Sequence, residues 1–71
     1  MPLTMLPLHK EGTISECRAK GETKKFLESH GMVPGASISV LTEINGDLIV
    51  MVKGSKLALN KGVAQQLLVQ I

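Results

Sequence analysis

Residues 36–53 read ASISVLTEINGDLIVMVK and carry the strongest secondary-structure signal in the chain. Apolar and polar side chains alternate over residues 36–44, which predicts a strand whose even-numbered side chains face the core. Asn45-Gly46-Asp47 is a strong hairpin signal and leads into a second apolar strand over 48–53. This stretch predicts a mainly β protein built around an antiparallel hairpin.

The loop of this hairpin allows two strand registers. A two-residue loop over 45–46 would place the charged Asp47 and Lys53 on the core face. A three-residue loop would instead pair Ile44 with Leu48 and keep both charges outside. Because a slip of one residue moves every side chain of a strand to the opposite face, burial favours the three-residue loop.

One helix is predicted, over residues 22–30. Phe26 and Leu27 share its apolar face, and Phe26 is expected to plug one end of the fold. Gly31 stands where a left-handed residue would end the helix. The helix therefore depends on packing through its two large apolar side chains.

Shorter apolar runs predict the remaining elements. These are strands over 13–17, 56–59 and 67–71, with Leu67, Val69 and Ile71 facing inward, and a helical turn within 60–66. The result is about five short strands, with the helix between the first two and the helical turn before the last. We expect a single domain over 1–71 with the fold of a small SH3-like β-barrel.

Composition excludes several classes of binding protein. Phe26 is the only aromatic residue among 71, so the chain lacks the aromatic grooves that hold proline-rich peptides and the stacking platforms of single-stranded nucleic-acid binders. The net charge of +2 is too small to indicate a polyanionic partner. We expect no nucleic-acid binding, and a cluster of basic residues is interpreted as a solvated face: Arg18, Lys20, Lys24 and Lys25.

Cysteine content and hydropathy indicate the compartment. Cys17 is the only cysteine, which fits a reducing environment. The apolar start over residues 1–8 lacks a basic n-region and contains two prolines, so it does not resemble a signal peptide. No run approaches the length of a membrane span. These features predict a cytoplasmic protein.

The sequence contains no recognised catalytic motif, neither a phosphate-binding loop nor a nucleophile elbow nor a zinc-protease helix, so no enzymatic activity is expected. Five residues offer the nitrogen, oxygen and sulfur donors that suit Fe²⁺ or Zn²⁺. They are His9, Glu11, Glu16, Cys17 and His30. None of them stands at a recognised ligand spacing, so they are candidates and no metal site is assigned.

Residues 26–35, FLESHGMVPG, resemble the L-x-x-L-G-hydrophobic-x-P-G segment of the FeoA (ferrous iron transport protein A) family. Further matches in the same order are Leu8, Gly12 and Ile14 before this segment, and Gly54, residues 57–59, Ala64 and residues 68–69 after it. His30 departs from the pattern, because the family has leucine there. A buried, unpaired histidine would be costly, so His30 is expected at the surface or in a hydrogen bond.

The resemblance implies an SH3-like barrel, a fold that also forms the C-terminal domain of iron-dependent repressors of the diphtheria toxin repressor type. It further implies a small cytosolic accessory protein that binds and modulates the ferrous iron transporter B (FeoB), a membrane permease with a cytoplasmic GTPase domain. The alternatives are a domain that senses or carries Fe²⁺ or Zn²⁺, and a stand-alone regulatory domain of repressor origin. A homo-oligomer is compatible with each of these.

Aliphatic side chains on the outward side of their strands are the first candidates for partner contact, because exposed apolar patches mark interaction sites. They are Leu41, Ile49, Met51 and Leu68. A second candidate surface is the turn after the helix, with Met32, Val33 and Pro34.

Overall fold

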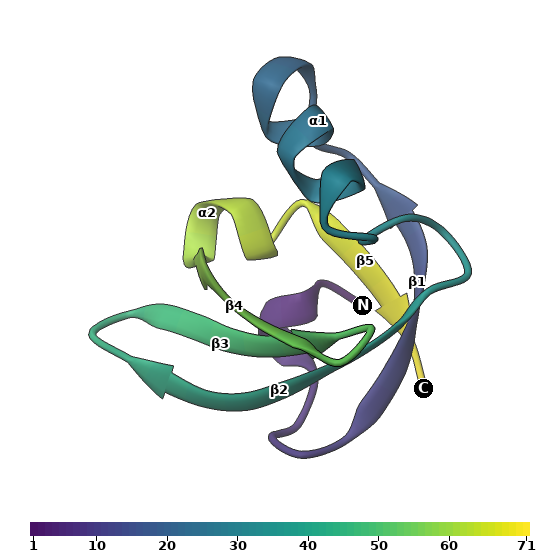
Figure 1. Ribbon diagram of the computed structural model, residues 1–71. Helices are drawn as coiled ribbons and strands as arrows, with labels where there is room; N and C mark the ends of the chain where they lie inside the picture. The colour runs from purple at the N-terminus through teal and green to yellow at the C-terminus, as the bar shows by residue number, and fades with distance from the viewer.

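The computed structural model describes residues 1–71 and contains one five-stranded antiparallel sheet with strand order β4-β3-β2-β1-β5. The strands are β1 (Glu11–Cys17), β2 (Ser37–Ile44), β3 (Asp47–Val52), β4 (Ser55–Asn60) and β5 (Leu67–Gln70). Helix α1 (Gly21–Ser29) joins β1 to β2, and the short helix α2 (Lys61–Ala64) joins β4 to β5. Figure 1 shows the sheet curled on itself, with α1 at the end of the sheet where β1 finishes. The predicted mainly β, SH3-like architecture is confirmed.

The core is entirely aliphatic apart from one methionine. Fifteen buried hydrophobic residues form a single cluster, and no buried side-chain nitrogen or oxygen lacks a hydrogen-bond partner. Its largest fully buried members are Leu3, Ile14, Leu27, Met32, Ile38, Leu67, Val40, Val50 and Val69. The cluster is contributed by both helices, the first residues of the chain and all five strands, so every element depends on it.

The loop between β2 and β3 has two residues, and the predicted three-residue loop is wrong. Ile44 pairs with Asp47 rather than with Leu48. Asn45 and Gly46 have φ angles of 52° and 87°, which is the pattern of a type I′ turn. The turn preference of the Asn-Gly pair therefore decides the loop.

A β-bulge at Leu41 keeps alternate apolar side chains of β3 in the core and the charged residues at its ends outside. The three-residue loop had been predicted for the same reason. The register shifts between Val40 and Thr42, so Val40 pairs with Val50 in the core. The extra residue turns the end of β2 over, and Thr42 and Ile44 face outward with Ile44 53% exposed. The prediction that even-numbered side chains face the core holds for the first half of β2 and is wrong beyond the bulge.

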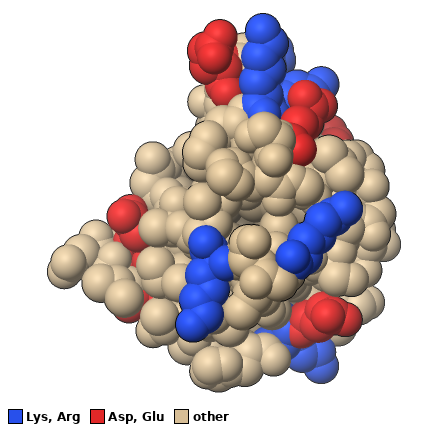
Figure 2. Space-filling model, viewed as in Figure 1, with Lys and Arg blue, Asp and Glu red and all other residues tan.

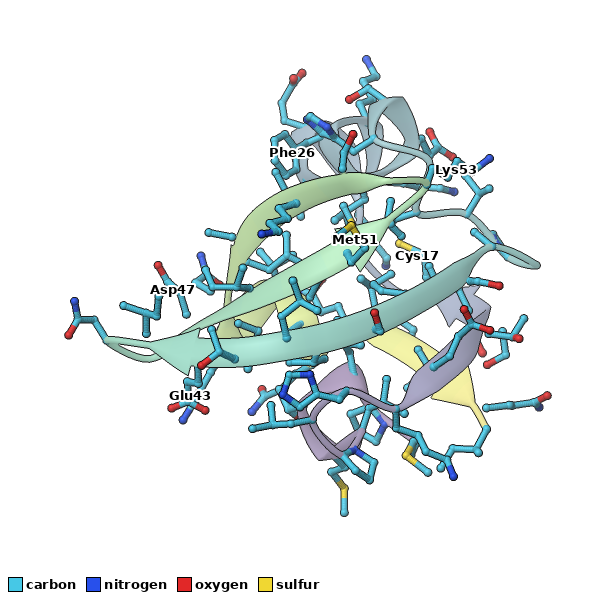
Figure 3. All side chains as sticks on the ribbon, turned by 60° about the horizontal axis from the view of Figure 1, so that its bottom comes forward. Cys17, Phe26, Glu43, Asp47, Met51 and Lys53 are labelled. Carbon is cyan, nitrogen blue, oxygen red and sulfur yellow. The ribbon has the colours of Figure 1, made fainter.

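Only one side chain of helix α1 is buried in the core. Leu27 is completely buried, whereas Phe26 is 43% exposed. Phe26 lies outside the curl of the sheet in Figure 3, so the prediction that it plugs the barrel is wrong. The helix ends as expected, because Gly31 has φ +81° and its N–H donates to Glu28 O at 3.0 Å.

The first residues of the chain belong to the fold, which the sequence analysis missed. A 3₁₀ helix, η1 (Leu3–Met5), buries Leu3 completely, and Leu6 is buried directly after it. Met1 and Val69 exchange two hydrogen bonds, N–H to carbonyl in both directions, at 2.7 and 2.9 Å. This segment covers the edge of β5.

At the other end of the chain Ile71 is 66% exposed, so the prediction that it faces inward is wrong.

Helix α2 begins with a side-chain cap that offers a simple test of local stability. Asn60 Oδ1 accepts a hydrogen bond of 2.9 Å from Val63 N–H. Replacing Asn60 with alanine is expected to lower the free energy of unfolding by about 0.5–2 kcal/mol in urea titrations followed by circular dichroism. Asn60→Asp keeps the acceptor and serves as the control. Equal loss in both variants would contradict the capping role.

Candidate functional site

The outer surface of β2, β3 and β4 carries an apolar stripe. Cross-strand pairing places Ile49 between Thr42 and Ala58, and Met51 in the next row between Ser39 and Lys56. Ile49 and Met51 are half-buried, and the exposed Ile44 occupies the row nearest the loop. We call this stripe the aliphatic face: Ile44, Ile49, Met51 and Ala58.

Of the four predicted outward aliphatic residues, Ile49 and Met51 lie together on β3, whereas Leu41 is the unpaired residue of the bulge in β2. The fourth lies elsewhere. Leu68 is on β5, which is separated from β3 by β2 and β1 in the order of the sheet. It pairs with Glu16 and forms a bridge with Pro2, so the N-terminal segment lies beside it. Ile44 takes its place in the aliphatic face. Ile44 was not predicted to face outward, because the bulge that turns it outward has no strong residue preference.

The second predicted surface is a shallow groove of about 240 Å³ between α1 and β1. Val33 and Pro34 line it together with Cys17 and Met32. Met32 is fully buried, however, so only Val33 and Pro34 of the predicted turn are accessible to a partner. Cys17 is half-buried at the end of β1.

The candidate metal ligands do not converge. Glu16 and Cys17 are neighbours on β1, but Glu16 forms an ion pair of 3.3 Å with Arg18. His30 ends α1, is exposed as expected, and its ring centroid lies 4.7 Å from that of Phe26. The two remaining candidates, His9 and Glu11, lie in the turn before β1 and at its first residue. Nowhere in the chain do three His, Cys, Asp or Glu residues come together as a metal site.

The charged surface is spread over several elements. All four residues of the basic cluster are exposed, in agreement with a solvated face: Arg18, Lys20, Lys24 and Lys25. Figure 2 shows blue and red side chains side by side on the uppermost part of the molecule, where α1 lies. Neither helix is long and apolar enough to cross a membrane.

Comparison with known proteins places this arrangement in a family. The model of the FeoA domain family matches residues 1–71. A crystal structure of an iron uptake regulatory protein (FeoA) is 30% identical, superposes with a TM-score of 0.86 and aligns over 97% of this chain and 92% of that one. No curated protein matches the chain.

Two further solved structures show the same fold at lower identity. FeoA of Stenotrophomonas maltophilia, complexed with zinc and described as a procaryotic SH3 domain protein, is 24% identical with a TM-score of 0.88 over 99% of this chain and 89% of that one. IdeR of T. acidophilum is 21% identical with a TM-score of 0.88, and this chain matches 33% of its length. With the family match over its whole length, the chain belongs to the FeoA domain family.

Proposed function

We propose that this protein is a non-enzymatic accessory of ferrous iron transport that acts by binding the cytoplasmic region of the ferrous iron transporter B. Family membership and the similarity to an iron uptake regulatory protein support the role in iron transport. The relative from Stenotrophomonas maltophilia is itself described as a candidate activating factor for ferrous iron transport. A cytoplasmic, single-domain protein fits this role.

The aliphatic face is the observation that carries the proposal. A β-sheet surface that faces water ordinarily carries polar side chains, yet Ile44, Ile49 and Met51 occupy successive rows here. Small domains rarely leave contiguous apolar side chains in water unless another protein covers them. Polar residues border the stripe, as expected for an interface with an apolar centre and a polar rim: Ser39, Asp47, Lys56 and Asn60.

An Ile49→Asp, Met51→Asp double variant is expected to bind the isolated cytoplasmic region of the transporter at least about tenfold more weakly, because each carboxylate would lose its water shell in an apolar contact. Affinity is measured by biolayer interferometry at matched salt. A milder Ile49→Thr, Met51→Thr variant keeps residues that favour strands and is expected to show a smaller loss in the same direction.

Thr13→Asp, Gln70→Asp is the matched control. These two exposed residues pair across β1 and β5, outside the aliphatic face, so the control adds the same charge at a different part of the sheet. Its affinity is expected to equal that of the wild type. Equal weakening of both double variants would show that charge and not the aliphatic face matters. No binding by the wild-type protein would refute the proposed function.

A further inference from the structure

A second concave surface lies between the end of α1 and the β3–β4 hairpin, and the sequence analysis did not identify it. This depression of about 530 Å³ is within the size range of ligand-binding clefts. We call it the hairpin groove. The side chains that matter for the argument are Glu28, His30, Lys53, Ser55, Lys56 and Leu57.

We propose that the hairpin groove binds an acidic peptide segment of a protein partner. The inference rests on the proposed function for the identity of that partner, the transporter's cytoplasmic region. The groove has three features that suit such a segment: positive charge, free hydrogen-bond donors and a fixed hairpin backbone.

Positive charge in the groove is not neutralised within the chain. The two ion pairs of the protein join Arg18 to Glu16 and Lys61 to Glu43, so neither Lys53 nor Lys56 has a carboxylate partner. Glu28 is the only acidic residue that lines the groove, against two lysines and His30.

Hydrogen-bond donors in the groove are also free. The Ser55 hydroxyl takes part in none of the side-chain hydrogen bonds of the protein. Lysine ammonium and serine hydroxyl groups are donors that carboxylates accept well. A groove with several unpaired donors and an apolar contact from Leu57 suits an extended segment that presents Asp and Glu side chains.

The chain holds Lys53 in position at some conformational cost. Lys53 and Gly54 have φ angles of 51° and 79°, the same turn that Asn45 and Gly46 form in the other hairpin. Asparagine is the usual first residue of this turn, whereas lysine has no side-chain acceptor to stabilise a left-handed backbone. A non-glycine residue in this conformation is a feature that clusters at binding sites.

The stem of Lys53 lies directly over Gly31. A Cβ atom at position 31 would stand 2.8 Å from Lys53 Cδ and 3.0 Å from Cε, so the lysine stem fills the space above this glycine and would have to shift if a side chain were added there. Figure 3 shows Lys53 at the α1 end of the hairpin. An ammonium group near the last turn of a helix also complements the helix dipole. This effect is one structural reason for a lysine at position 53. Lys56, from β4, also lines the groove, and the helix dipole gives no reason for this second lysine.

Other ligands fit less well. Proline-rich segments dock between aromatic rings, and the only aromatic residue of the chain does not line the groove. Nucleic acids need a wider basic footprint than two lysines in a chain of net charge +2. A short run of carboxylates needs only the few lysine and serine donors that line the groove.

The test uses the full chain labelled with nitrogen-15 and a synthetic peptide of Asp, Glu and Gly, titrated by NMR. Chemical shift changes are expected at His30, Lys53 and Ser55, with an affinity that falls as salt is raised. A Lys53→Gln, Lys56→Gln variant is expected to bind the peptide about three- to tenfold more weakly, since each exposed ion pair contributes modestly.

Lys24→Gln, Lys25→Gln removes the same charge from α1 outside the groove and is expected to bind like the wild type. Equal loss in this control would refute the inference, because net charge alone would then explain binding. So would equal binding of a peptide with Asn and Gln in place of Asp and Glu, or displacement of the acidic peptide by an equal concentration of inorganic phosphate.

A parallel measurement separates this inference from the proposed function. A Lys53→Gln single variant is titrated against the cytoplasmic region of the transporter, where a loss of affinity is expected; Lys56 is left unchanged because it also borders the aliphatic face. If the wild type binds the transporter but not the peptide, the groove inference is wrong and the proposed function stands. If it binds the peptide in the groove but not the transporter, the proposed function is wrong.

Discussion

A Leu27→Ala variant is expected to lose about 2–5 kcal/mol in the free energy of unfolding, the range for truncating a fully buried leucine. Leu27 is the only residue of α1 that is buried, with 0% exposure. A helix of nine residues is not stable by itself in water, so it stays folded only while this side chain is packed. For a chain of 71 residues the total stability is about 4–10 kcal/mol, and the variant should therefore be largely unfolded at moderate urea.

Phe26→Ala is the matched control for this prediction, because it removes a larger side chain from the next position of the same helix. Phe26 is 43% exposed and its ring contacts His30, so its loss should cost at most about 1 kcal/mol. Urea unfolding followed by far-ultraviolet circular dichroism gives both values. A larger loss for Phe26→Ala than for Leu27→Ala would contradict the packing described for α1.

Truncating Leu3 is expected to have an effect of the same size, about 2–5 kcal/mol. Leu3 is completely buried in the central cluster although it lies in a 3₁₀ helix of three residues near the start of the chain. Its loss would leave a cavity and also release the segment that hydrogen-bonds to Val69. Amide hydrogen exchange in β5 should become faster in Leu3→Ala, since the edge of that strand would open to solvent.

Met5→Ala controls for a general effect of changing this segment. Met5 belongs to the same 3₁₀ helix but is 69% exposed, so its removal should change the free energy of unfolding by less than about 0.5 kcal/mol. Unchanged stability in Leu3→Ala would mean that the N-terminal segment rests on the domain without stabilising it. Urea titration, as for the Leu27 variant, shows whether the N-terminal segment stabilises the domain.

The order of the elements could be read from the sequence because local signals agree with the global fold. Alternation in residues 36–40, the Asn45-Gly46 pair and the glycine after the helix each predict what the structure contains. The hairpin register could not be read, because two requirements conflicted. The turn favoured two residues and burial favoured three, and a bulge at Leu41 satisfies both. A bulge has no strong residue preference, so the pattern gave no sign of it.

The candidate surfaces were predictable only in part, for a related reason. Outward parity along β3 identified Ile49 and Met51, since that strand is regular. The same alternation along β2 predicted that Ile44 faces inward, which is wrong because Ile44 lies beyond the bulge. The hairpin groove was invisible, because its two sides, the end of α1 and the β3–β4 hairpin, are more than 20 residues apart in the sequence and meet only in the folded chain.

The position of Phe26 has a practical consequence for spectroscopy. The protein has neither tryptophan nor tyrosine, so it is almost silent in near-ultraviolet absorbance and has no useful intrinsic fluorescence. Its single ring sits at the surface and contacts His30, a residue of the hairpin groove. Tryptophan at this position would leave the aliphatic core untouched and place a fluorophore beside the groove. The one aromatic position of the chain is thus a natural place for an optical reporter of ligand binding.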